Sequence, residues 1–135
     1  MATMRETRRV QAGRDTENSN AGMGGIMNET EFLDLAHGVL DTIESHVDEW
    51  EARLDVDVEA VFSGNVLTIT FEDGTQVVVN SQAAMQEIWV AARSGGFHYR
   101  YDGQHWRDTR GGPDLADALS QICSDAAGQV LAVRL

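Results

Sequence analysis

Closely spaced turn signals between residues 63 and 103 limit the fold of this chain more than any other feature. Glycine-containing turns at 63–65, 72–74, 94–96 and 102–103 interrupt short runs rich in β-branched and aromatic residues. Those runs are 66–71, 76–80, 87–92, 97–101 and 104–108. Connections this short cannot hold a crossover helix, so consecutive runs must pair as antiparallel hairpins. We therefore predict an antiparallel meander for the middle of the chain.

Two amphipathic helical patterns flank this meander. In residues 29–52, apolar residues recur at three- and four-residue spacing, and Asn28 or Thr30 can cap the first turn. A second helix is predicted to begin near Pro113 and Asp114 and to end at Gly128. The order of elements predicts an α+β fold, a two-layer sandwich in which the N- and C-terminal helices pack on one face of an antiparallel β-sheet.

Residues 1–26 differ in composition from the rest of the chain. They contain few large apolar side chains, and their ordering entropy would not be offset by burial. A cluster of four arginines could belong to a targeting peptide, but three acids and the missing apolar face argue against that interpretation. We predict a disordered N-terminal extension or a cloning remnant for 1–26, and one domain for 27–135.

The charge of the chain excludes several classes of partner. The net charge is −12, and all ten basic residues are arginine. Nucleic acid is not expected as a partner, because phosphate binding requires cationic surface. A membrane is not expected either, since the sequence has no apolar run of about 20 residues. The single cysteine, Cys123, fits a reducing compartment, and we expect a soluble cytoplasmic protein.

The acids concentrate on one side of the first predicted helix and in the segment after it. Asp41, Glu44, Asp48 and Glu51 follow each other by three, four and three residues. Like charges at this spacing each cost a few tenths of a kcal/mol, and the only cation of the helix, Arg53, comes at its end. The next run, 55–62, alternates acid and apolar residues and is predicted as a strand. Its period of two places Asp55, Asp57 and Glu59 on one face.

Carboxylates in this arrangement suit hard cations such as Ca²⁺, Mg²⁺, Mn²⁺ and iron. The sequence has no EF-hand loop, and carboxylates on a rigid helix face cannot surround an ion. The pattern predicts weak, exposed and multiple cation sites, with His37 as an additional ligand. A merely solvated helix face explains the spacing equally well.

Several other residues receive structural interpretations. Trp50 lies on the apolar side of the first helix and is predicted to be in the core, whereas Trp106 fits either the core or the sheet surface, with the surface favoured. Cys123 lies on the apolar stripe of the second helix and is predicted to be a buried, unreactive thiol. His98 and His105 occupy adjacent runs and could form a metal pair, but structural roles are favoured.

Several short motifs, taken in order, resemble the bacterial frataxin family. They are VLTITFEDG (66–74), NSQ (80–82), IWVAA (88–92), GGFHY (95–99) and WRD (106–108), preceded by NETEF (28–32) and DEW (48–50). The resemblance covers residues 27–135 and implies the same helix–sheet–helix fold. It further implies a non-enzymatic, iron-binding regulator or adaptor of iron–sulfur cluster assembly, which docks through an acidic ridge on cysteine desulfurase.

The resemblance also implies a set of site residues. The acidic ridge of the family, transferred to this chain, comprises Glu44, Asp48, Glu49, Glu51, Asp55, Asp57 and Glu59. Together with Asp41 and His37 from the helical spacing, these are the predicted ligands for weakly bound Fe²⁺ or Fe³⁺, or for other divalent cations. The predicted partner-binding residues are Glu44, Asp48, Glu49, Asp57, Asn80, Gln82 and Trp89. From sequence alone, a core position for Trp89 fits as well as an exposed one; the resemblance favours the exposed one.

Three positions depart from the family pattern. Ser45 and Arg53 stand where bacterial relatives commonly have acids, which predicts a lower iron capacity, and Ala84 replaces a frequent proline, which predicts a looser turn. The scaffold protein of iron–sulfur assembly is a second expected partner. We expect a monomer, with metal-induced oligomers as the alternative.

Two other functions stay open at this point. A ferroxidase that oxidises and stores iron would require fixed paired ligands, and the chain has no Glu-x-x-His helix pairs of the di-iron kind. An acidic protein-interaction module without physiological metal binding would use the same ridge without iron.

Overall fold

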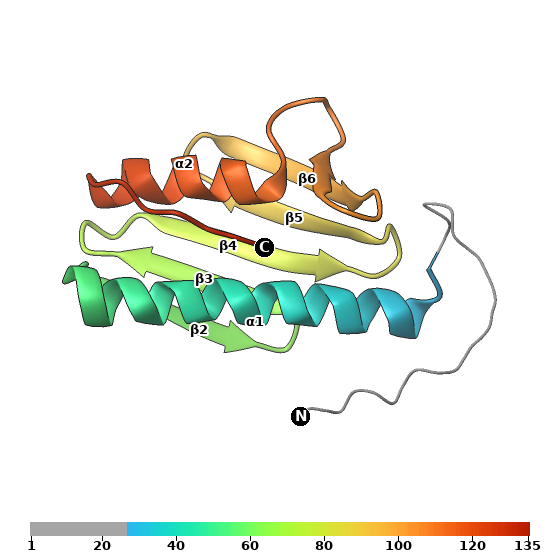
Figure 1. Ribbon diagram of the computed structural model, residues 1–135, viewed down its shortest axis with the longest axis horizontal. Coiled ribbons are helices and arrows are strands. Elements are labelled where there is room, and N and C mark those ends of the chain that lie inside the picture. Colours follow the sequence, from blue (N-terminus) through green and yellow to red (C-terminus); the bar gives the residue numbers. More distant parts are fainter. Residues whose placement is uncertain (1–26) are drawn as a thin grey trace.

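The computed structural model describes residues 27–135, and the prediction for residues 1–26 lies outside them. The chain forms a helix, six strands and a second helix (Figure 1). In order these are α1 (Glu29–Leu54), β2 (Val58–Ser63), β3 (Val66–Phe71), β4 (Gln76–Gln82), β5 (Glu87–Ala92), β6 (Gly95–Tyr101), β7 (Trp106–Asp108) and α2 (Leu115–Ala127). Both helices cover the same face of the sheet, as Figure 1 shows, so the predicted two-layer α+β sandwich is confirmed.

The sheet is a simple antiparallel meander in which each strand pairs with the next one in sequence. Its register aligns Asn80, Trp89 and His98 in one row across β4, β5 and β6. The next row on the same face contains Gln82, Glu87 and Arg100. Directly opposed residues share a face, and Glu87 and Trp89 alternate with the core residues Ile88 and Val90, so both rows point away from the helices.

Capping residues determine both ends of α1. Asn28 and Glu31 form a capping box, in which each side chain accepts a hydrogen bond from the backbone N–H of the other. At the other end Asp55 adopts a left-handed conformation (φ 56°), and its N–H bonds the Trp50 carbonyl. The predicted strand over 55–62 therefore began too early, because Asp55 ends the helix and β2 starts only at Val58.

The core lies between the helices and the inner face of the sheet. Trp50 and Cys123 are buried there as predicted. The prediction that Trp106 is on the surface was wrong, since only 4% of this residue is exposed. Its ring meets Phe32 of α1 edge-on at a centroid distance of 6.2 Å and packs beside Tyr101 at 5.2 Å. A short final strand thus contributes to the core through its first residue.

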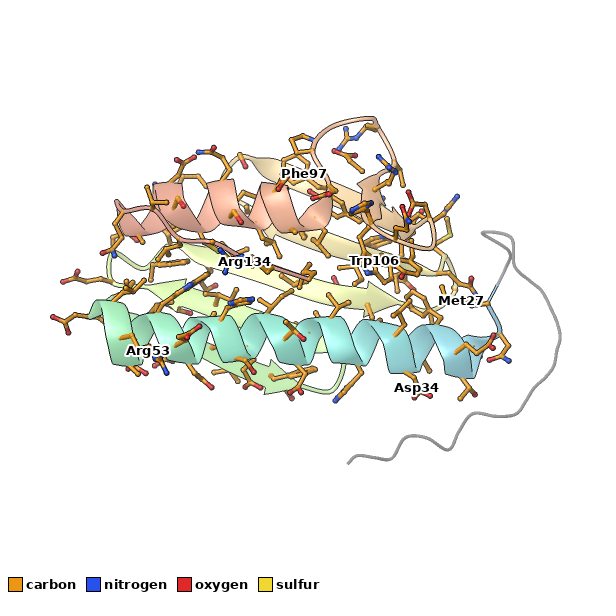
Figure 2. All side chains as sticks on the ribbon, in the orientation of Figure 1. Met27, Asp34, Arg53, Phe97, Trp106 and Arg134 are labelled. Carbon is orange, nitrogen blue, oxygen red and sulfur yellow. The ribbon has the colours of Figure 1, made fainter. Side chains whose placement is uncertain are left out.

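The C-terminal tail, residues 130–135, runs back between the two helices and over β4 (Figure 1). Leu131 and Val133 are buried, and their backbone N–H groups donate to the hydroxyls of Ser124 and Ser120 on α2. Figure 2 shows Arg134 of this tail lying between the helices. No helix in residues 27–135 is long and apolar enough to span a bilayer.

Candidate cation and partner surfaces

The predicted acidic ridge is a real surface feature. Six of its seven carboxylates are exposed, and Glu44 is half-buried. The exposed ones are Asp48, Glu49, Glu51, Asp55, Asp57 and Glu59. Val56 and Val58 are buried between these exposed acids, so the alternation expected of an edge strand holds from residue 56 onward.

Few cations neutralise the ridge. Arg53 forms an i,i+4 ion pair with Glu49 at 3.7 Å, and both side chains are more than half exposed. Exposed pairs of this kind contribute little, because water and salt screen them. Between residues 27 and 135, no other ion pair involves a ridge acid.

The backbone adds to the negative potential. Both helices end at the same end of the molecule, where the ridge also lies, and Figure 2 places Arg53 there. Helix C-termini carry partial negative charge, and α2 has no basic residue in its last turn. The exposed carboxylates and the two helix C-termini therefore make this end of the molecule negative.

A small cleft at this end brings the ridge together with acids that the sequence analysis missed. Asp55 and Asp57 line a cavity of about 230 Å³ with Glu72 and Asp73 of the β3–β4 turn. The sequence identified residues 72–74 only as a hairpin turn. No sequence signal showed that this turn lies beside the end of α1, because that proximity depends on the length and crossing of the elements between them.

The ridge does not form a closed chelate. Within the described part of the chain, no three His, Cys, Asp or Glu side chains converge closely enough to hold a metal ion. His37, predicted as an additional ligand, lies with its ring against Phe62 of β2 at a centroid distance of 5.1 Å. The donors are hard and exposed but spread out, which fits weak association with several cation positions rather than one rigid site.

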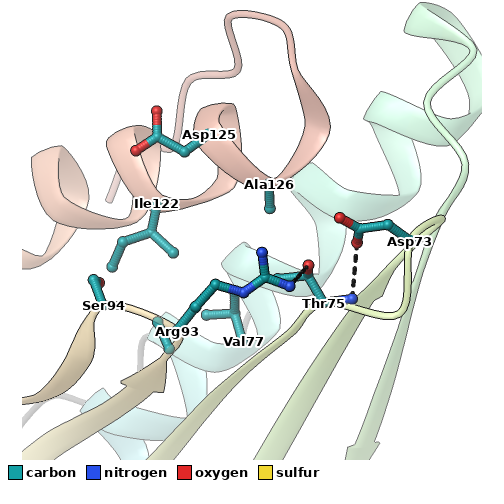
Figure 3. A pocket seen from close by; sticks show the side chains of 9 residues that line it. Asp73, Thr75, Val77, Arg93, Ser94, Ile122, Asp125 and Ala126 are labelled. Carbon is teal, nitrogen blue, oxygen red and sulfur yellow. Dashed lines mark hydrogen bonds between the residues drawn. The ribbon is translucent and has the colours of Figure 1, made fainter.

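A second cleft, of about 260 Å³, lies between α2 and the turns on the same side of the sheet (Figure 3). Here the Asp73 carboxylate accepts a hydrogen bond from the Thr75 N–H (2.8 Å), and Arg93 donates to the Thr75 hydroxyl (2.9 Å). Hydrogen bonds from Thr75, with a smaller contribution from the charge of Arg93, lower the pKa of Asp73. Asp73 is therefore a carboxylate that stays ionised between the two clefts.

The predicted sheet residues form a separate surface on the face opposite the helices. Asn80, Gln82 and Trp89 are half-buried and lie next to each other across β4 and β5. Trp89 points outward, away from the core residues Ile88 and Val90. The structure adds His98, whose ring stacks on that of Trp89 at 4.3 Å and 9°, and Glu87 with Arg100 beside them. The sequence analysis considered His98 and His105 as a metal pair. In the structure His98 is in β6, whereas His105 is in the turn before β7.

A comparison with protein families agrees with this geometry. The model of the frataxin-like domain matches residues 25–129. The chain belongs to the frataxin-like family. Among curated frataxin-like relatives, the iron-sulfur cluster assembly protein CyaY of Bordetella parapertussis is 76% identical over 109 residues, which are 81% of this chain and all of that protein. The CyaY of Cupriavidus metallidurans is 49% identical over 108 residues, covering 80% of this chain and 97% of that protein.

Solved frataxin structures have the same fold. The frataxin of Psychromonas ingrahamii aligns with a TM-score of 0.72 at 28% identity, over 81% of this chain and all of that one. A trimeric frataxin of Saccharomyces cerevisiae aligns with a TM-score of 0.61 at 25% identity, over 78% of this chain and 95% of that one. The resemblance stated from the short motifs is confirmed.

Proposed function

We propose that this frataxin-like protein takes part in iron–sulfur cluster assembly as an iron-binding regulator or adaptor, without catalysing a reaction itself. Its ridge would dock on cysteine desulfurase, and Asn80, Gln82 and Trp89 would make a further contact with the assembly machinery. Two relatives named above carry the name iron-sulfur cluster assembly protein. That name supports the pathway, and the surfaces described above support the mode of binding.

The single observation that carries the docking proposal is the uncompensated charge of the ridge. The seven ridge carboxylates form only one ion pair within residues 27–135, the exposed pair of Glu49 with Arg53. Both helix C-termini lie at the same end of the molecule as the ridge. A surface of this kind attracts a basic partner over a distance and accelerates the encounter at low ionic strength. The complex should therefore weaken steeply as salt is added.

Iron is the cargo in this proposal, and its binding should be weak. Exposed carboxylates keep most of their hydration, and spread-out donors offer each ion only a few ligands. The cleft at the end of the ridge brings four such ligands together, since Glu72 and Asp73 line it with Asp55 and Asp57. Either Fe²⁺ or Fe³⁺ suits these oxygen donors, and other divalent cations should compete.

The test of docking is a charge reversal with a matched control. We expect the triple variant Asp48→Lys, Glu49→Lys, Asp57→Lys to lose binding to purified cysteine desulfurase in a pull-down at low salt, with folding retained. The control reverses three exposed acids away from the ridge, namely Glu29, Asp34 and Asp117. If the ridge variant binds like the control, the role proposed for the ridge is refuted.

Two further measurements separate the alternatives. Titration with Fe²⁺, Fe³⁺ and Ca²⁺ should shift the amide resonances of residues 41–59 and 72–73; unchanged resonances would favour an interaction module that does not bind metal. Oxygen uptake by the unmodified protein after addition of Fe²⁺ should match that of the ridge variant. Uptake that depends on the ridge carboxylates would instead favour a ferroxidase.

A further inference from the structure

The outward face of the sheet contains a buried carboxylate. Glu87 points to the same side as Trp89, away from the helices, where acidic side chains normally extend into water. Only 3% of Glu87 is exposed, and it is the one charged residue between positions 27 and 135 that is buried. Removing a carboxylate from water is costly unless hydrogen bonds and opposite charge compensate. The side chains that cover Glu87 must supply both.

Two neighbouring side chains occupy both oxygens of this carboxylate. The indole Nε1–H of Trp89 donates to Oε1 at 2.8 Å, and Arg100 Nη2 donates to Oε2 at 2.6 Å. The His98 ring lies parallel to the indole, with its Nδ1 3.6 Å from Oε1 of Glu87. The carboxylate is thus enclosed by the indole of Trp89, the guanidinium of Arg100 and the His98 ring that stacks on the indole.

This arrangement fixes the orientation of the Trp89 ring. The indole is held at its nitrogen by Glu87 and over its face by His98, so rotation about its side-chain torsions would break two contacts at once. Because the N–H is already bonded within the protein, a partner would meet ring carbons rather than a hydrogen-bond donor. A rigid, preoriented aromatic ring is a favourable interface anchor, since little side-chain entropy remains to be lost on binding.

We propose that Glu87 is a positioning residue for partner recognition at this face, acting through Trp89. This inference rests on the proposed partner contact of Trp89. It goes beyond that contact by assigning to a buried acid, which the partner does not touch, control over the orientation of the ring. It also assigns Arg100 a role, because its guanidinium compensates the charge that Glu87 would otherwise leave uncompensated.

The test combines Glu87→Leu and Glu87→Gln with Trp89→Ala, alone and in pairs. Affinity is measured for purified cysteine desulfurase mixed with the scaffold protein. Exchange of the indole proton is followed by ¹⁵N NMR, where Trp89→Ala identifies the resonance. We expect slow exchange in the unmodified protein and fast exchange in Glu87→Leu, with affinity lower by about tenfold. Glu87→Gln keeps an acceptor for the indole and should stay within about threefold.

The double variants decide the inference. If Glu87 acts through Trp89, Glu87→Leu causes no further loss once Trp89 is alanine. An equal loss in both backgrounds, or an indole exchange rate unchanged by Glu87→Leu, overturns the positioning role. If Glu87→Leu does not fold, Glu87→Ala, which also removes the acceptor for the indole, takes its place in the same pairs. Unchanged affinity in Trp89→Ala alone would refute the proposed sheet-face contact, and indole exchange would still decide whether Glu87 holds the ring.

Discussion

His46 of α1 holds the backbone of Arg134 in the C-terminal tail. Its Nε2 lies 3.1 Å from the Arg134 carbonyl oxygen and 3.2 Å from the Arg134 amide nitrogen. The ring also stacks beside Trp50, with centroids 6.4 Å apart. Through this contact the last residues of the chain are attached to the first helix as well as to α2.

Removing the His46 ring should loosen the tail. We expect His46→Ala to lower the free energy of unfolding by about 1–2 kcal/mol, because a hydrogen bond and the packing on Trp50 are lost together. Urea denaturation measures the difference. The control is Ser45→Ala, the adjacent exposed position, whose hydroxyl bonds only the preceding turn of the same helix. Equal stability of the two variants would show that the tail is held by other contacts.

Truncation of Trp106 should be far more damaging. Because this ring is buried against Phe32 and Tyr101, we expect Trp106→Ala to cost about 3–5 kcal/mol of unfolding free energy. Val61, exposed on the edge strand β2, provides the comparison, and Val61→Ala should stay within about 0.5 kcal/mol. A mild effect at Trp106 in the same denaturation experiment would contradict its place in the core.

Neutralising the ridge should stabilise the fold while weakening docking. Asp48 lies four residues from Glu44 and three from Glu51, so Asp48→Asn removes two like-charge contacts. We expect a gain of about 0.3–0.5 kcal/mol in unfolding free energy at low salt, which diminishes as salt screens the original repulsion. Thermal unfolding at two ionic strengths measures both quantities. A loss of stability at low salt would mean that Asp48 has a favourable contact.

The Cys123 thiol should resist modification while the protein is folded. Desolvation by burial raises its pKa to about 12, from a usual value near 9. At pH 8 the reactive thiolate is then about a thousandfold scarcer than in the unfolded chain. A thiol reagent should label Cys123 rapidly in urea and slowly in buffer. Fast labelling of the folded protein would contradict this environment.

The same raised pKa gives a pH dependence of stability. Above pH 9 the unfolded chain releases the Cys123 proton while the folded protein keeps it, so the unfolded state binds fewer protons. The free energy of unfolding must therefore fall as the pH rises from about 9 to 12. Tyr99, whose pKa burial raises to about 12, contributes in the same direction. Urea midpoints across this range should decrease, and less so in Cys123→Ala.

The sequence predicted the elements of this fold well because their signals are local. Turn residues and hydrophobic periodicity identified the strands and both helices, and Gly128 ended α2 as expected. Two details were predicted wrongly. Asp55 could have begun a strand by its alternation, but capping of α1 required a left-handed residue there. The short run around Trp106 gave no indication of which face it would bury.

The candidate surfaces were predicted only in part. Spacing along the first helix and alternation in the segment after it were sufficient to find most of the ridge, since its members are near in sequence, whereas Glu49 came only from the family resemblance. Glu72 and Asp73 were missed because they approach Asp55 only after the sheet has formed. Glu87 was missed for a different reason, since an acid in an alternating strand gives no sign that Trp89 and Arg100 will enclose it.

The parallel course of the two helices has one more consequence. Both helices run toward the end of the molecule where Arg53 lies, so their peptide dipoles add along the long axis, with the ridge carboxylates at the negative end (Figure 2). A molecule with such a permanent moment experiences a torque near a positively charged surface. It would turn its acidic end forward before any contact forms, so that collisions in the wrong orientation become a smaller fraction of all encounters.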